Sequence, residues 1–91
     1  MVYKVLVSRT FQKRFYQLQK NTQNLIKKSL KELEQDPHTS KSKCDIKLLK
    51  DTQPRKYRLR ISDYRIIYIV ERREVKVIDL LKREIGYSRL E

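Results

Sequence analysis

The chain has 91 residues, of which 38% are hydrophobic and 37% are charged, and its formal net charge is +12 at pH 7. This length suits one domain spanning residues 1–91 with a single core, and it leaves no room for a second domain. So high a positive charge favours nucleic acid as the partner, ahead of an acidic protein or an anionic membrane surface.

The content of cysteine and histidine narrows the possible chemistry further. Cys44 is the one cysteine, which excludes an intrachain disulfide and a cysteine-rich zinc site. His38 is the one histidine, so we expect no metal and no cofactor, and the commonest general base is missing. No long apolar run or signal-peptide pattern occurs, which predicts a cytoplasmic protein that does not enter the membrane.

The first half of the chain predicts a strand followed by a helix. Residues 2–7 are short, apolar and β-branched, as in a strand, and Ser8 is a plausible helix N-cap. The helix should run to about Lys20, because apolar side chains recur at spacings of four and three. These side chains are Phe11, Phe15 and Leu18.

A second helix should follow, capped by Thr22 and ended by Asp36 and Pro37, because proline disfavours helical geometry in the residue before it. Its apolar stripe consists of Leu25, Ile26, Leu30 and Leu33. The two helices would form a helical hairpin. Residues 37–54 are predicted to be an irregular connection.

The second half predicts three strands, at about 55–61, 64–71 and 74–81, with turns at 62–63 and 72–73. The order is therefore β-α-α-β-β-β. This order predicts an α+β domain in which an N-terminal strand and a helical hairpin precede a three-strand antiparallel meander.

The stretch KYRLRISDYRIIYIV, residues 56–70, alternates cations with apolar side chains. Successive side chains of a strand point to opposite faces, so Lys56, Arg58 and Arg60 should stand in a row on one side. A two-residue turn would place Arg60 opposite Arg65 on that same side. The other side should meet the helices; it collects Tyr57, Leu59, Ile61, Tyr64, Ile66, Tyr68 and Val70.

The next hairpin extends this register along the chain. It would place Val70 opposite Val75, Tyr68 opposite Val77, and Arg65 opposite Leu80. The chain would then leave the sheet beside Arg65. Three further side chains should therefore emerge near Arg60 and Arg65, namely Lys82, Arg83 and, after a short link, Tyr87. The same register puts Asp79 on the core side opposite Ile66, which would mark a bulge or an exposed strand end.

A row of cations is either a solvated surface or a binding site for phosphate, and convergence of cations from separate segments favours binding. Cleavage of RNA would also need a group that accepts the 2'-hydroxyl proton, cations for the crowded phosphorane, and protonation of the leaving oxygen. A lysine among arginines loses its proton more readily, and an exposed tyrosine can stack on a base.

The element order, the stretch KYRLRISDYRIIYIV and the ending LLKREIGY resemble the RelE/ParE superfamily of prokaryotic toxins, and the RelE branch most closely. This resemblance implies the toxin of a type II toxin–antitoxin system that inhibits translation. It would be a ribosome-dependent endoribonuclease cleaving messenger RNA in the A site. Metal-free attack of the 2'-hydroxyl would leave a 2',3'-cyclic phosphate and a 5'-hydroxyl.

The resemblance also implies roles for particular residues. The catalytic set would be Lys56, Arg65, Arg83 and Tyr87, and the RNA-binding set Arg58, Arg60 and Lys82. RelE itself has a second lysine where this chain has Arg58, and arginine does not give up its proton in proteins. The general base is therefore either Lys56 or Tyr87.

Two other functions remain open at this stage. One is inhibition of DNA gyrase, as in ParE-like members of the same fold, and the other is a non-catalytic RNA- or ribosome-binding module. The partners implied are an acidic, RelB-like antitoxin that neutralises the toxin, the ribosome with its messenger RNA, and operator DNA through the antitoxin complex alone.

Overall fold

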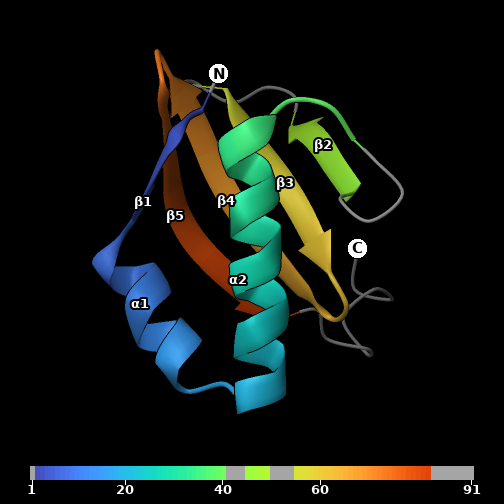
Figure 1. Ribbon diagram of the computed structural model, residues 1–91. Helices are drawn as coiled ribbons and strands as arrows, with labels where there is room; N and C mark the ends of the chain where they lie inside the picture. The colour runs from blue at the N-terminus through green and yellow to red at the C-terminus, as the bar shows by residue number, and fades with distance from the viewer. Residues whose placement is uncertain (1, 41–44, 50–54, 83–91) are drawn as a thin grey trace.

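The computed structural model describes residues 2–40, 45–49 and 55–82. Within them the chain forms two helices and five strands (Figure 1). In chain order the elements are β1 (Lys4–Val7), α1 (Arg9–Tyr16), α2 (Lys20–Gln35), β2 (Asp45–Leu49), β3 (Lys56–Ile61), β4 (Tyr64–Glu71) and β5 (Glu74–Lys82). The predicted α+β class is therefore confirmed.

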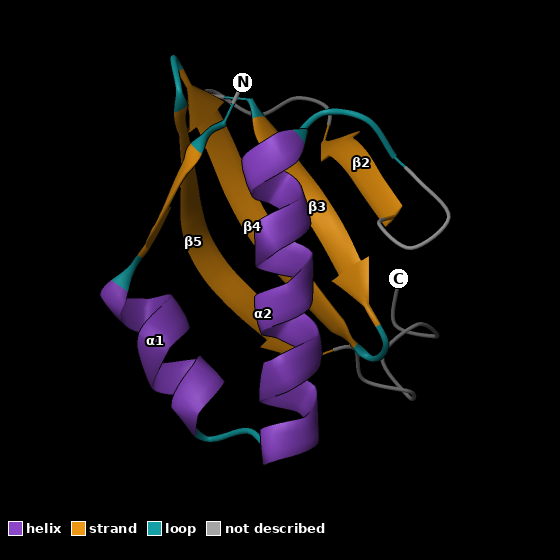
Figure 2. Ribbon diagram, in the orientation of Figure 1, coloured by secondary structure: helices purple, strands orange, loops and turns teal. Residues whose placement is uncertain are grey.

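The five strands form one mixed sheet in the order β1-β5-β4-β3-β2, and both helices lie on the same face of it (Figure 2). The antiparallel meander of β3, β4 and β5 is confirmed. Two features differ from the prediction. β1 pairs with β5 in parallel, and β2 adds an antiparallel strand beside β3.

The prediction of an irregular connection over residues 37–54 was wrong where β2 forms. Ile46 lies opposite Leu59 in the core and is 8% exposed, while the neighbouring Asp45 and Lys47 are exposed. One buried side chain is enough to attach this short strand to the sheet edge. The apolar signal in the sequence is correspondingly weak.

The helices begin and end close to the predicted positions. The Ser8 hydroxyl accepts a hydrogen bond of 3.0 Å from the backbone N–H of Phe11, which confirms Ser8 as N-cap. The first helix is shorter than expected and ends at Tyr16. The prediction of Thr22 as the second cap was wrong, because Gln19 holds that position without a side-chain cap bond. Neither helix has the length and apolar character needed to cross a membrane.

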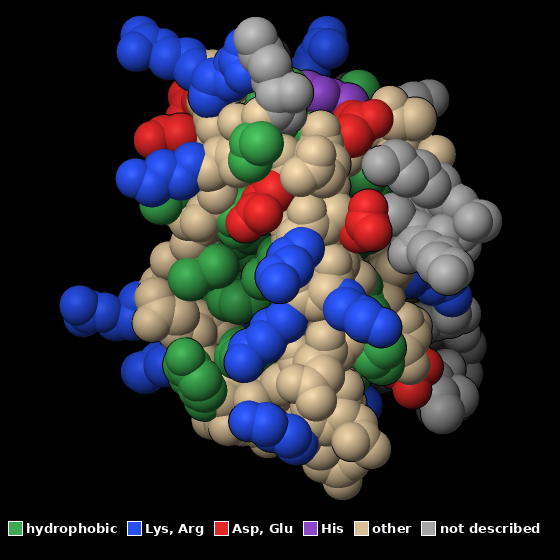
Figure 3. Space-filling model, in the orientation of Figure 1, with side chains coloured by type: hydrophobic (Ala, Val, Ile, Leu, Met, Phe, Trp, Pro, Cys, Tyr) green, Lys and Arg blue, Asp and Glu red, His purple; other side chains and the backbone are tan. Residues whose placement is uncertain are grey.

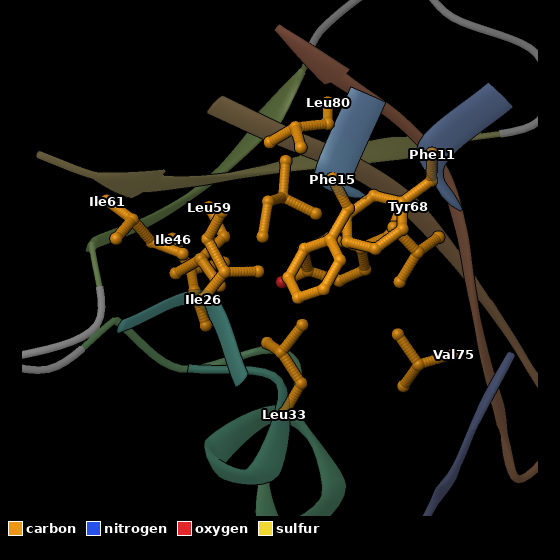
Figure 4. Close-up of a cluster of buried hydrophobic side chains, with 12 residues drawn as sticks. Phe11, Phe15, Ile26, Leu33, Ile46, Leu59, Ile61, Tyr68, Val75 and Leu80 are labelled. Atoms are coloured by element: carbon orange, nitrogen blue, oxygen red, sulfur yellow. The ribbon is translucent and has the colours of Figure 1, made fainter. Parts of the chain in front are cut away.

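The core lies between the helices and the sheet (Figure 4). Phe11 and Phe15 enter it from α1, and Ile26 and Leu33 enter it from α2. The strands contribute the other buried side chains, namely Ile46, Leu59, Ile61, Ile66, Tyr68, Val75, Val77 and Leu80. The predicted helix-facing side of β3 and β4 is thereby confirmed.

Tyr68 is the central aromatic residue of this core and is 0% exposed. Its hydroxyl donates a 2.7 Å hydrogen bond to the carbonyl of Pro37, just beyond the end of α2. Its ring stacks on Tyr57, with ring centroids 5.4 Å apart. The tyrosine therefore connects the end of α2 to the middle of the sheet.

The β3–β4 register matches the prediction, with Arg60 opposite Arg65. In the next hairpin, Val70 and Tyr68 pair with Val75 and Val77 as predicted. The register then shifts between Ile67 and Tyr68, because β5 contains one more residue than β4 at this point.

This bulge corrects two predicted pairs. Arg65 lies opposite Leu81, one residue later than expected, and Asp79 lies opposite Ile67 instead of Ile66. The bulge that Asp79 indicated in the sequence is confirmed, and Asp79 is half-buried and not part of the buried core. Its carboxylate lies 3.5 Å from Nε of Arg14 on α1.

Candidate nucleic-acid interface

The candidate site lies on the face of the sheet opposite the helices, where β2, β3 and β4 run side by side. We call it the basic face, and it consists of Lys47, Lys56, Arg58, Arg60 and Arg65. Among the described residues, no helix covers this side of the sheet (Figure 2).

Strand pairing brings these cations together from three strands. Arg58 lies opposite Lys47, and Arg60 lies opposite Arg65. Directly opposed residues have Cα atoms about 5 Å apart, and like charges in that arrangement destabilise the sheet. Lys56 is about 13 Å from Arg60 along β3, since a strand rises about 3.3 Å per residue. The cations thus form an elongated patch, suited to a chain of phosphates.

Two of the arginines are only partly in contact with solvent. Nε of Arg58 and Nε of Arg65 are buried and have no hydrogen-bond partner among the described residues. A buried donor of this kind costs about 1–3 kcal/mol, and native structures hold few of them. The sheet therefore fixes these guanidinium groups at a cost to stability. A binding role explains that cost better than a solvated surface does.

Apolar side chains lie between the cations. Ile67 is opposite Arg58, and Ile69 follows it on the same face; both are half-buried. The face therefore offers flat apolar area beside charged groups, which is the combination that single-stranded nucleic acids use.

The other predicted residues are not all part of this face. Lys82 pairs with Tyr64, whose ring packs against the core. Because paired residues share a face, Lys82 lies on the helix side of the sheet and not on the basic face. Lys82 directly follows Leu81, the residue that pairs with Arg65. Arg83 and Tyr87 lie outside the described residues.

Sequence reasoning missed the contribution of β2 to the site. Lys47 extends the basic face beyond β3, and the carboxylate of Asp45 lies 3.4 Å from Nη2 of Arg58. The alternation of charged Asp45 and Lys47 around Ile46 was the one available signal.

Near the β4–β5 turn, the uncovered face of the sheet carries an ion pair of opposite charges. Lys76 donates a 2.8 Å hydrogen bond to Glu71, which lowers the pKa of Glu71 and raises the pKa of Lys76 from their ordinary values. This pair lies beside the β4–β5 turn, at the far end of β4 from Arg65. The excess positive charge of the face is therefore at its β2–β3 end.

Cations also occur on the helical side of the molecule (Figure 3). α2 carries exposed lysines at Lys20, Lys27, Lys28 and Lys31. They are spread among polar side chains and add a long-range attraction for phosphate without forming a defined site.

The fold and the basic face together define a small α+β domain that presents a row of cations on the uncovered side of its sheet. A family model described as the ParE toxin of type II toxin–antitoxin system, parDE, matches residues 5–87. The chain belongs to this family, within the RelE/ParE superfamily. No curated protein matches the chain.

Solved structures place it close to the RelE branch. The chain is 28% identical to a chain in the archaeal RelE–RelB complex from Pyrococcus horikoshii OT3, with a TM-score of 0.81, covering 93% of this chain and 99% of that one. It is 26% identical to a chain in the RelB–RelE antitoxin–toxin complex from Methanococcus jannaschii, with a TM-score of 0.70. That match covers 94% of this chain and 99% of that one. It is also 26% identical to a chain in the intact E. coli RelBE toxin–antitoxin complex, with a TM-score of 0.60. That match covers 90% of this chain and 98% of that one.

Proposed function

We propose that the chain is a ribosome-dependent endoribonuclease that cleaves messenger RNA in the A site and thereby inhibits translation in the cytoplasm. The observation that carries this proposal is the basic face, where Arg60 and Arg65 oppose each other and Arg58 and Lys56 continue the row of cations along β3. Similarity to structures of RelE–RelB complexes supports the same branch of the family.

In the proposed reaction the 2'-hydroxyl attacks the adjacent phosphate, and the 5'-oxygen leaves with a proton. Arg65 and Arg83 stabilise the negative charge that develops on the phosphorane, and Arg83 assists the leaving oxygen. Lys56 or Tyr87 accepts the proton of the 2'-hydroxyl, and Tyr87 also stacks on the reacting base. The products are a 2',3'-cyclic phosphate and a 5'-hydroxyl.

The remaining cations would hold the RNA. Arg58 and Arg60 bind phosphates along β3, and Lys82 adds charge near the end of β5. The proposed catalytic set contains no histidine, the commonest general base, so the proposal assigns a large part of the rate to positioning of the substrate by the ribosome.

The proposed protein partner is an acidic, RelB-like antitoxin. The similar structures from P. horikoshii and M. jannaschii are described as complexes of RelE with RelB. A charge of +12 on this chain favours such an acidic partner, which would cover the basic face or displace residues 82–91. Operator DNA would be bound through the antitoxin complex.

A second candidate function is inhibition of DNA gyrase, because the matching family model carries the ParE description. The residues of the basic face favour the ribonuclease, since gyrase inhibition does not require a set of groups for proton transfer. A non-catalytic RNA-binding module would use the same face without producing cuts.

The test is primer extension on a defined messenger RNA in a translation reaction, with and without ribosomes. Cuts within A-site codons that require ribosomes and disappear in Arg65→Ala would support the ribonuclease. Arg73→Ala is the matched control, because Arg73 is exposed in the β4–β5 turn, at the far end of β4 from Arg65. Without cuts, a gyrase supercoiling assay tests the second candidate, and salt-sensitive RNA binding alone would indicate the binding module.

A further inference from the structure

In the part of the chain that the structure describes, one carboxylate contacts an arginine of the basic face. Asp45 is the first residue of β2 and lies opposite Arg60 in the strand register. Its Oδ1 nevertheless lies 3.4 Å from Nη2 of Arg58, the diagonal neighbour on β3. Diagonal neighbours in antiparallel pairs are within reach of long side chains.

This contact is weak in geometry although it joins opposite charges. A strong charge-assisted hydrogen bond between nitrogen and oxygen measures about 2.7–2.9 Å, shorter than the separation here. The Asp45 side chain is 54% exposed, whereas that of Arg58 is 17% exposed. The aspartate can therefore swing into solvent while the arginine stays packed in the sheet.

The arginine, by contrast, has hydrogen-bonding capacity to spare. Within residues 2–40, 45–49 and 55–82 its Nε has no partner, and its ion pair with Asp45 joins one nitrogen to one carboxylate oxygen. A phosphodiester of RNA carries one negative charge, as a carboxylate does, and it can present two oxygens to the planar guanidinium. A phosphate bound through two oxygens would engage Arg58 more fully than the single 3.4 Å contact with Asp45 does.

We propose that Asp45 is a displaceable counter-ion for Arg58, holding the guanidinium in the free protein and yielding it to a phosphate of the bound RNA. The proposal rests on the proposed function, because it takes RNA as the incoming anion. Asp45 is thus a positioning residue that lowers the affinity for loose RNA. RNA whose phosphates are held at several points at once overcomes this competition.

The test measures binding of a single-stranded RNA whose 2'-hydroxyls are methylated, so that cleavage cannot occur. Asp45→Asn is compared with Asp63→Asn, which removes the same charge from the exposed β3–β4 turn. Both changes remove a negative charge that repels RNA, so each should tighten RNA binding. The additional increase in affinity in Asp45→Asn measures the effect of the contact with Arg58. We expect an excess of about two- to five-fold, the range for a partly exposed ion pair.

The same comparison in an Arg58→Gln background should show no excess. Equal effects of the two aspartate changes, an excess that persists without Arg58, or weaker binding in Asp45→Asn would each overturn the proposal. Weaker binding would mean that Asp45 only supports the site.

A second titration separates this inference from the proposed function. Inorganic phosphate is added to labelled protein, and the Nε–H signal of Arg58 is followed by NMR. Tighter phosphate binding at Arg58 in Asp45→Asn than in Asp63→Asn supports Asp45 as a counter-ion, whether or not the chain binds RNA. If the chain binds no RNA, that result refutes the proposed function and leaves the counter-ion proposal standing. Equal phosphate affinities refute the counter-ion.

Discussion

The salt dependence of RNA binding gives a quantitative test of the basic face. Five cations lie on this face, contributed by β2, β3 and β4. Each phosphate neutralised on a single strand contributes about −0.7 to the slope of log K against log salt concentration. The full face therefore predicts a slope of about −3.5, equivalent to a loss of about 100-fold in affinity between 50 and 200 mM salt.

The perturbation is Arg60→Gln, which removes the exposed cation opposite Arg65 and keeps a long polar side chain. The slope should become less steep by about 0.7, and the affinity at low salt should fall. Fluorescence anisotropy with the methylated RNA at several salt concentrations measures both quantities.

Lys27→Gln is the matched control, because Lys27 is an exposed cation on α2, in the helical layer. It should leave the slope nearly unchanged. Equal changes of slope in the two variants, or a wild-type slope shallower than about −1, would refute contact of RNA along the basic face.

Three further predictions concern stability. Tyr68→Phe removes the buried 2.7 Å hydrogen bond to Pro37 and should lower the free energy of unfolding by about 1–3 kcal/mol in urea titrations; an unchanged midpoint would contradict this role. Ser8→Ala removes the N-cap of α1 and should cost about 0.5–2 kcal/mol in the same assay, whereas a loss below that range would show that the cap bond is dispensable. Glu71→Gln removes the negative charge that pairs with Lys76, and this pairing lowers the folded-state pKa of Glu71. Wild type should exceed the variant in urea midpoint at pH 7, and the difference should vanish as pH falls from the ordinary value of 4.5 through that lowered pKa. A difference that does not depend on pH would exclude this ion pair as its cause.

The β3–β4 hairpin could be predicted residue by residue from the sequence. Alternating arginines and apolar side chains determine which face is buried, and a slip by one residue would bury Arg58 and Arg60. The helices were predicted for a similar reason, because Phe11 and Phe15 recur at helical spacing in α1, as Ile26 and Leu33 do in α2, and all four are buried. Where many side chains favour one arrangement, the sequence pattern is sufficient to predict the structure.

The failures occur where one or two residues decide the outcome. β2 has one buried side chain, Ile46. Asp79 on the core side of the predicted register indicated a bulge in β5, but no glycine or proline marked its exact position. The contact of Asp45 with Arg58 follows from pairing between β2 and β3, so it could not be predicted once β2 was missed. Arg83 and Tyr87 remain predictions, because they lie outside the described residues.

The parallel pairing of β1 with β5 has a consequence for the order of folding. Val5 at the start of the chain pairs with Val75, and the cap residue Ser8 bonds to Ile78, 70 residues away in sequence. Contacts between such distant segments form late, because the intervening chain must first be synthesised and brought together. The sheet is thus completed only when almost the whole chain has emerged from the ribosome. A nascent chain that lacks β5 leaves β1 unpaired, so truncation before β5 should abolish folding along with any activity of the basic face.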